Sequence, residues 1–229
     1  MSNEAHVLDQ FQHPHILRLF HDGTDSAPWF IAVEWIAGGS LRAHLEQHGP
    51  MPRTDCQAMS VGLMDALAEL HRAGVIHRDI KPDNILMRDV RDIVLCDFGI
   101  AQVPNERLTV ADTKMGSLHF MAPEQRVDAR AAGPAADLYA VGCTLYYTLT
   151  GWNPYNLFMA HRGSPRWETL PAPLADVLFK ATRLDLAERY ADSTQMASDL
   201  QAAFRAVCDD GGAGVSGVQS LGATTTLPG

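Results

Sequence analysis

The sequence predicts an α+β protein with a small lobe of short strands and a larger, mainly α-helical lobe. Two runs near the start of the chain, at 15–20 and 28–36, are rich in β-branched and aromatic residues and indicate strands. From residue 54 onward, apolar residues recur every three or four positions, which indicates amphipathic helices. A chain of 229 residues is long enough to bury one or two cores, so it can form two lobes.

The N-terminal elements are a helix and the two strands. Val7, Leu8 and Phe11 share one face of a helix predicted over 4–12, and Pro14 follows as a stop. The first strand, HILRLF, is separated from the second, PWFIAVEWI, by the turn-rich segment HDGTDSA.

Glycines and an N-cap residue mark the first helices of the larger lobe. A Gly-Gly-Ser turn at 38–40 ends in an N-cap for a short helix over 41–47. The clearest amphipathic helix covers 54–73, and Gly74 supplies its C-terminal stop. The apolar face of this helix consists of Cys56, Met59, Leu63, Leu67 and Leu70.

The later elements are small strands, an irregular stretch, helices and a tail. Apolar runs too short for helices predict strands at 75–77, 85–87 and 93–96. Residues 100–122 have no regular pattern, and helices are predicted over 136–149, 172–183 and 193–207. The Gly-, Ser- and Thr-rich segment 208–229 has little to bury, which predicts a disordered tail or linker.

Composition and charge restrict the class of protein. With 46% hydrophobic and 20% charged residues, the chain has the composition of an ordinary soluble protein. A formal net charge of −9 argues against nucleic-acid binding and against an anionic membrane surface. The sequence shows neither a signal-peptide pattern at its start nor an apolar run suited to a membrane span. Widely spaced cysteines favour reduced thiols in a cytoplasmic protein over disulfides or a zinc site: Cys56, Cys96, Cys143 and Cys208.

Three ordered motifs carry the chemistry. Residues 77–84 read HRDIKPDN, residues 97–99 read DFG after an apolar run, and residues 122–124 read APE. In this order the motifs resemble the catalytic segment of the serine/threonine protein kinase family. The resemblance covers about residues 4–207 and implies a protein-kinase-like α+β fold with an incomplete small β lobe.

The resemblance implies transfer of the γ-phosphoryl group of ATP to a serine or threonine of a protein substrate. Asp79 would accept or orient the proton of the attacking hydroxyl, and Lys81 would neutralise charge on the transferred group. Asn84 and Asp97 would hold Mg²⁺, for which oxygen ligands are suited. Phosphoryl transfer depends on positioning and electrostatics, so an acid, a cation and a metal ligand in one loop fit this chemistry.

Further residues would contact adenine. Glu34-Trp35-Ile36 resembles the hinge between the lobes, where the backbone groups of Glu34 and Ile36 would bind the base. Val33 would then be the gatekeeper and Leu86 the apolar floor of the adenine site. For Val33 and Leu86 a plain core role fits equally well, because apolar strand residues are usually buried.

The resemblance also implies regulatory positions. Thr113 stands where many members of the family are phosphorylated, and Arg78 would bind that phosphate through its guanidinium. An unmodified Thr113 is equally compatible with the sequence. Ser117 stands where such kinases usually carry a threonine that supports the catalytic loop.

Four residues would have structural roles. Asp137 would be the buried acid that anchors the catalytic loop, and Glu124 would form a buried ion pair with Arg189. Glu4 would be the helical glutamate of the small lobe.

Two features of the family lack a counterpart. No lysine precedes Lys81 and the only glycine before Gly38 is Gly23, so neither the Gly-rich loop nor the strand lysine is found. One interpretation is a truncated form of an ordinary kinase, and the alternative is a catalytically degenerate kinase-like binding or scaffold module. The retained catalytic residues favour the first. We expect little turnover and weak nucleotide binding from this chain by itself.

The predicted organisation has three parts. Residues 1–36 are expected to form the remnant of the small lobe, 37–207 the large lobe with the catalytic and activation segments, and 208–229 the tail. The sequence gives no indication of the oligomeric state.

Overall fold

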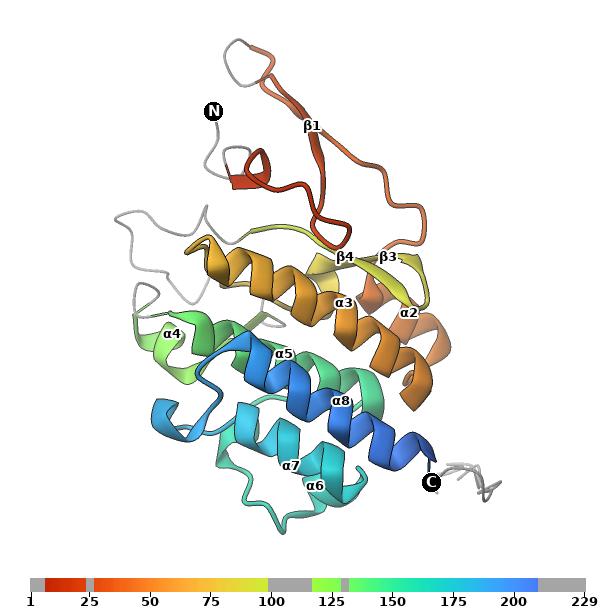
Figure 1. The fold of residues 1–229 in the computed structure, drawn as a ribbon, viewed down its shortest axis with the longest axis vertical. Coiled ribbons are helices and arrows are strands. Elements are labelled where there is room, and N and C mark those ends of the chain that lie inside the picture. Colours follow the sequence, from red (N-terminus) through yellow and green to blue (C-terminus); the bar gives the residue numbers. More distant parts are fainter. Residues whose placement is uncertain (1–6, 24–26, 99–116, 129–131, 210–229) are drawn as a thin grey trace, which may run out of the picture.

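A computed structural model describes residues 7–23, 27–98, 117–128 and 132–209 of the chain (Figure 1). Within these ranges four strands form two separate hairpins: β1 Leu19–Asp22, β2 Ile31–Val33, β3 Ile85–Asp89 and β4 Asp92–Leu95. The α-helices are α2 Leu41–His48, α3 Arg53–Arg72, α4 Pro123–Val127, α5 Pro134–Thr150, α6 Pro165–Glu168, α7 Ala172–Ala181 and α8 Ser193–Asp209. Short 3₁₀ turns are η1 Pro82–Asn84, η3 Ser117–His119, η5 Leu157–Met159 and η6 Leu186–Glu188.

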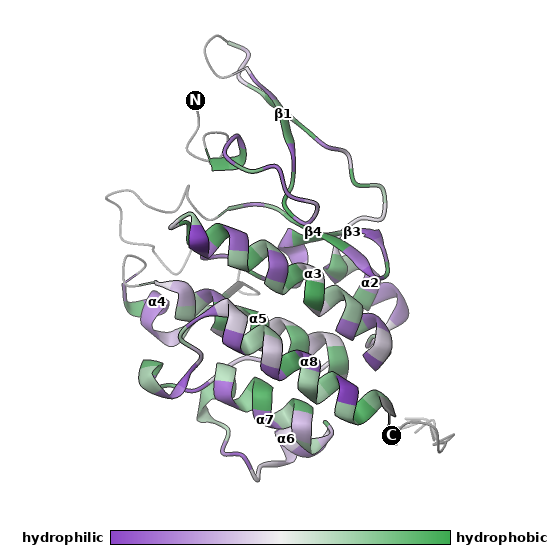
Figure 2. Cartoon of the chain, in the orientation of Figure 1, coloured by the Kyte–Doolittle hydropathy of each residue, from purple (hydrophilic) through white to green (hydrophobic). Residues whose placement is uncertain are grey.

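The large lobe is a stack of helices beneath the β3–β4 hairpin (Figure 1). Helix α8 packs against α3 and α7, and α5 packs against both α3 and α7. In Figure 2 hydrophilic and hydrophobic segments alternate along α3 and α8, as expected for helices with one buried face. Around the buried Trp167, the rings of Tyr146 and Phe179 lie edge-on at 5.5 and 5.6 Å.

The small sheet is joined to the large lobe through the segment 15–17. Strands β1 and β2 are antiparallel, with Leu19 opposite Val33. Before β1, the Leu17 N–H donates to the Leu95 carbonyl at 3.0 Å and the Leu95 N–H donates to the His15 carbonyl at 2.9 Å. The segment therefore adds a short parallel pairing to the edge of β4, and the core is continuous between the lobes.

The helices predicted from residue 41 onward are present within a few residues of their predicted bounds, whereas the strands differ more. The segment 15–17 pairs with β4, so β1 begins only at Leu19. Strand β2 begins at Ile31, and Pro28 in the predicted strand has no N–H to donate to a ladder. The predicted strand 75–77 is irregular, because a side chain rather than a strand takes the His77 N–H.

The ends of the chain are described only in part. Residues 7–8 are helical, and the remainder of the predicted helix 4–12 is either irregular or outside the described residues. Helix α8 continues to Asp209, two residues beyond the predicted end at 207, and the rest of the predicted tail lies outside the described residues. Among the described helices, none is both long enough and apolar enough to span a membrane.

Candidate active site

The segment 77–84 is anchored from below by Asp137, in the first turn of α5. One carboxylate oxygen of Asp137 accepts from the His77 N–H at 2.9 Å and from His71 Nε2 at 2.8 Å. The other oxygen accepts from the Arg78 N–H at 2.8 Å. Asp137 is only 1% exposed, so these bonds are shielded from water and fix the start of the loop.

His77 connects this loop to the segment after β4. Its Nε2 lies 3.0 Å from the Cys96 carbonyl, which can only accept, so Nε2 carries the proton. Its Nδ1 then accepts from the Asp79 N–H at 3.3 Å, and its ring packs 4.9 Å from that of Phe98. Burial lowers the pKa of His77, which keeps this buried ring neutral.

Asp79, Lys81 and Asn84 form one bonded group. Lys81 Nζ lies 2.6 Å from Asp79 Oδ2, and Asn84 Nδ2 donates to the same oxygen at 2.9 Å. Asn84 Nδ2 also donates to the Asp79 carbonyl at 2.8 Å, so the amide nitrogen is committed and Asn84 Oδ1 is directed elsewhere. Among the described residues, Asp79 Oδ1 has no hydrogen-bond partner.

These residues line a cavity of about 650 Å³ together with Asp97. Asp97 follows β4, is exposed, and has a positive φ of 56°, which a non-glycine residue adopts at some cost. Arg78 also has a positive φ, of 69°. The segment that carries Asp79 and the segment that carries Asp97 therefore each contain an uncommon backbone conformation. The rest of the cavity wall consists of Arg42, Asp83, His119, Phe120, Tyr147, Asn153 and Pro154.

The predicted adenine residues lie outside this cavity lining. Ile36 is buried, Leu86 and Val33 are half-buried, and the Glu34 N–H donates to the Arg18 carbonyl at 2.9 Å. The chain after Ile36 passes close to β3: a Cβ on Gly38 would lie 2.1 Å from the Met87 carbonyl oxygen, so only glycine fits there.

Arg88, on β3, holds the segment around Glu34 in place. Arg88 NH2 lies 3.0 Å from both carboxylate oxygens of Glu34, and Arg88 NH1 donates to the Pro14 carbonyl at 2.7 Å. The guanidinium thus connects both small-lobe segments to the large lobe.

The APE motif is fixed by the ion pair that the resemblance implied. Arg189 donates to the two carboxylate oxygens of Glu124 at 2.9 and 2.8 Å. The next residue, Gln125, donates through Nε2 to the Arg78 carbonyl at 2.5 Å, so the motif contacts the catalytic loop directly. Arg78 Nε is buried and has no hydrogen-bond partner among the described residues.

Three predicted positions are described in part or not at all. Glu4 and Thr113 lie outside the described residues, so the roles assigned to them, and the binding of a phosphate by Arg78, stay predictions. Ser117 opens η3, but its side chain also lies outside the description.

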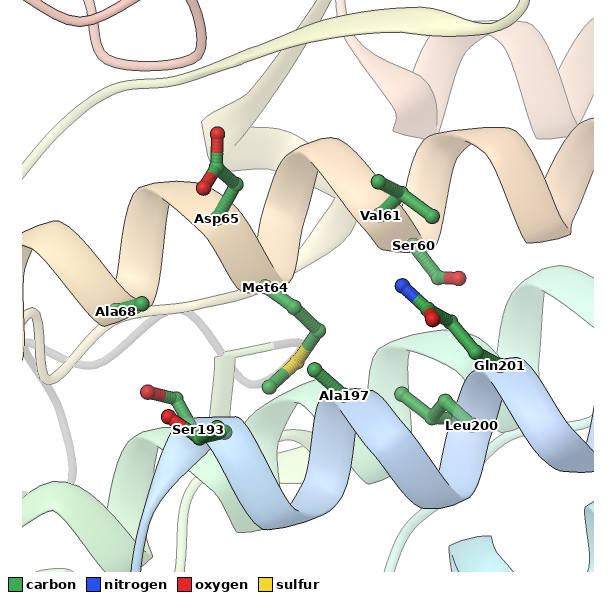
Figure 3. Close-up of a pocket in the computed structure, with 10 residues that line it drawn as sticks. Ser60, Val61, Met64, Asp65, Ala68, Ser193, Ala197, Leu200 and Gln201 are labelled. Atoms are coloured by element: carbon green, nitrogen blue, oxygen red, sulfur yellow. The ribbon is translucent and has the colours of Figure 1, made fainter.

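A second cavity, of about 360 Å³, lies between α3 and α8 (Figure 3). Met64, Ala197 and Leu200 point into it from the two helices, and Asp65 points away from α8 in this view. Its lining combines apolar side chains with a few hydroxyls and an amide, and none of the predicted catalytic residues lies in it. Within the described ranges, no cluster of three or more His, Cys, Asp or Glu residues could hold a metal ion.

Several residues of the site were not predicted. Arg42, His119 and Tyr147 come from three separated segments and reach the catalytic cavity only through the fold. The contact of His71 with Asp137 and that of Arg88 with Glu34 likewise join distant positions, for which no local sequence pattern exists. Gln125 differs from these residues because it directly follows the APE motif, so its position in the sequence could have indicated a role in the site.

Comparison with known proteins gives a consistent result. The family model described as "Protein kinase domain" matches residues 1–199. The chain is 34% identical over 212 residues to the serine/threonine-protein kinase PknL of Mycobacterium tuberculosis, covering 87% of this chain and 53% of that protein. It is 29% identical over 216 residues to the serine/threonine-protein kinase PrkC of Bacillus subtilis, covering 89% of this chain and 33% of that protein.

A solved structure shows the same fold. The structure of Rad53 residues 1–466 in complex with AMP-PNP matches with a TM-score of 0.70 at 24% sequence identity, over 86% of this chain and 53% of that one. This match confirms the predicted fold class. The chain spans about half the length of PknL and a third of PrkC.

Proposed function

Because this chain belongs to the protein kinase family, as a member related to serine/threonine kinases, we propose that its site transfers the γ-phosphoryl group of ATP to serine or threonine side chains of proteins. The observation that carries the proposal is the shared cavity of Asp79, Lys81, Asn84 and Asp97. Such a site needs an acid that orients the acceptor, a cation for the developing charge, and oxygen ligands for a metal.

The contacts suit these roles. Asp79 is held through Oδ2 by Lys81 and Asn84, which leaves Oδ1 to accept a hydrogen bond from an acceptor hydroxyl. Lys81, half-buried at 15% side-chain exposure, would place its ammonium group beside the transferred phosphoryl group. Loss of the Asp79 carboxylate would therefore remove the acceptor's partner and the ion pair with Lys81.

Two ligands for Mg²⁺ fit the donor set. Asn84 turns its amide nitrogen to Asp79, so its oxygen is available, and the exposed carboxylate of Asp97 lines the same cavity. One or two protein oxygens are what Mg²⁺ usually takes beside nucleotide phosphates, and Asn84 and Asp97 would supply two. When bound, Mg²⁺ would neutralise phosphate charge and orient the nucleotide.

The remaining assignments belong to the same proposal. Glu34 and Ile36 would bind adenine through backbone groups, with Leu86 as the apolar floor. The two lobes would divide after residue 36, and the tail would begin after α8, which ends at Asp209. A cytoplasmic location is supported by the four free cysteines.

Nucleotide binding provides the test, because it does not require turnover. We expect ATP binding measured by calorimetry to depend on Mg²⁺ and to weaken at least tenfold in Asp97→Ala, while Asp79→Ala changes it little. Asp89→Ala, which removes an exposed charge from the β3–β4 hairpin outside the cavity, is the matched control. Any transfer of labelled phosphate to a protein acceptor should be abolished by Asp79→Asn.

A kinase-like binding or scaffold module is the second candidate. Metal-independent ATP binding that is unaffected by Asp97→Ala would support this candidate and refute the metal-site assignment.

A further inference from the structure

The wall of the catalytic cavity that faces an acceptor segment has its own charge pattern. Asp83 lies four residues after Asp79 in the same loop, and both line the cavity. A protein segment that presents its hydroxyl to Asp79 must therefore pass the side chains around Asp83. If the site is a protein kinase site, as proposed above, these side chains decide which residues are tolerated beside the acceptor.

Arg42, from the first turn of α2, covers Asp83. Its Nε and NH2 groups lie 3.4 and 3.3 Å from Asp83 Oδ2. The guanidinium also lies 4.8 Å from the centre of the Tyr147 ring and 5.6 Å from that of Phe120. The two rings hold the guanidinium in place without using its N–H groups, so its position does not depend on Asp83 alone.

The pairing changes what the cavity offers to a substrate. Asp83 by itself would attract a lysine or arginine next to the acceptor residue. With Arg42 beside it, the carboxylate is neutralised, and an incoming cation would also meet the charge of Arg42. The Arg42 side chain is 22% exposed and that of Asp83 is 49% exposed, so both remain within reach of a bound segment.

His119 adds a second donor to this wall. Asn153 Oδ1 accepts from the Tyr155 N–H at 2.9 Å, which turns the Asn153 amide nitrogen toward His119 Nδ1 at 3.0 Å. Nδ1 is therefore the acceptor, and Nε2 carries the proton. Burial lowers the pKa of His119, and the charges of Arg126 and Arg42 lower it further, so the ring is neutral at pH 7.

We propose that Arg42 is a specificity-determining residue that prevents selection of basic residues beside the phosphorylated serine or threonine. The substrate class is then protein segments with acidic or neutral residues next to the acceptor. This inference rests on the proposed kinase function, since it concerns the acceptor side of the same cavity.

The test measures binding of acceptor peptides to the full 229-residue chain. Labelled peptides with a single serine, differing only in lysine, glutamine or glutamate at the flanking positions, are titrated by fluorescence anisotropy at low ionic strength. The variant Arg42→Met keeps an unbranched apolar stem against Tyr147 and Phe120 but removes the charge. Arg91→Met is the matched control, because Arg91 pairs with Asp55 on the surface and does not line the cavity.

We expect the wild type and Arg91→Met to bind the glutamate peptide at least as tightly as the lysine peptide. In Arg42→Met the lysine peptide should bind roughly three- to fivefold more tightly than the glutamate peptide, the range for one exposed charge pair. Asp83→Asn should shift the preference in the opposite direction, toward glutamate. The double variant Arg42→Met/Asp83→Asn should show little dependence on peptide charge.

Two failures are distinguishable. If the peptides bind but the charge preference is the same in the wild type and Arg42→Met, or the wild type already prefers lysine, the role of Arg42 is refuted and the kinase proposal stands. If no peptide binds to any variant while ATP binding also ignores Asp97, the acceptor site does not exist and both proposals fail.

Discussion

The ion pair of Glu124 and Arg189 should contribute far more to stability than a surface pair. The Arg189 side chain is 0% exposed and that of Glu124 17%. Besides its two bonds to Glu124, Arg189 donates through Nε to the Arg183 carbonyl at 2.6 Å and through NH2 to the Leu184 carbonyl at 3.1 Å, and it lies over the Tyr139 ring at 4.9 Å. Glu124→Ala would leave this guanidinium buried, charged and without its anion.

The expected cost follows from that geometry. Removing one partner of a buried pair costs about 3–5 kcal/mol. For a chain of this size, 1 kcal/mol corresponds to roughly 2–4 °C, so the melting temperature should fall by roughly 6–20 °C. Arg189→Ala should have a similar effect, because it strands two backbone carbonyls as well as Glu124. The double variant Glu124→Ala/Arg189→Ala should lose clearly less than the sum, since no unpaired charge remains buried.

Urea unfolding followed by circular dichroism measures these free energies. Arg162→Ala is the control, because Arg162 and Asp176 lie 2.5 Å apart with side chains 34% and 66% exposed. That pair should contribute about 0–1 kcal/mol. The reasoning is refuted if Glu124→Ala costs no more than Arg162→Ala, or if the two single losses at 124 and 189 add up to the loss in the double variant.

Two further predictions concern pH and local stability. Burial places the folded-state pKa of His77 below its unfolded value of about 6.5, so the contribution of the neutral ring to stability is present above that pH and is lost as pH falls toward the folded pKa. Between pH 7.5 and 5.5, the free energy of unfolding of His77→Gln should therefore fall less than that of the wild type. An equal fall in the two proteins would contradict the assignment. Amide hydrogen exchange should be fast in β1 and β2, because a two-stranded sheet is marginally stable, and slow in α5, because most of that helix is buried. Equal protection of the two regions would show that the small sheet is stabilised in a way that these contacts do not explain.

The sequence predicted the helices well and the strand bounds less well, for physical reasons. The apolar face of α3 repeats along the chain, so it is visible locally, and five residues predicted on that face are buried: Cys56, Met59, Leu63, Leu67 and Leu70. The start of β1 at Leu19 depends instead on the pairing of 15–17 with Leu95, about eighty residues away. Strand pairing of this kind is a long-range property, and local patterns do not specify it.

The candidate site divides in the same way. Asp79, Lys81, Asn84 and Asp97 could be found because they stand in motifs whose chemistry needs those residue types at those spacings. Arg42 and His119 could not be found, because an arginine on a short helix and a histidine in a loop are common on protein surfaces. Only the fold places them in the wall of the cavity that Asp83 also lines.

The backbone pairing of 15–17 with β4 and the contacts of Arg88 with Glu34 and Pro14 affect the free energy of ligand binding. Many two-lobed proteins sample open and closed arrangements, and a ligand that needs the closed one loses apparent affinity in proportion to how rarely that arrangement is populated. Here the paired backbone and the Arg88 guanidinium, which is bound to Glu34 and Pro14, hold the small lobe against the large lobe without a ligand. A molecule that contacts both lobes should therefore lose little binding free energy to closure of the lobes. Its association rate should be limited by access to the cavity rather than by domain motion.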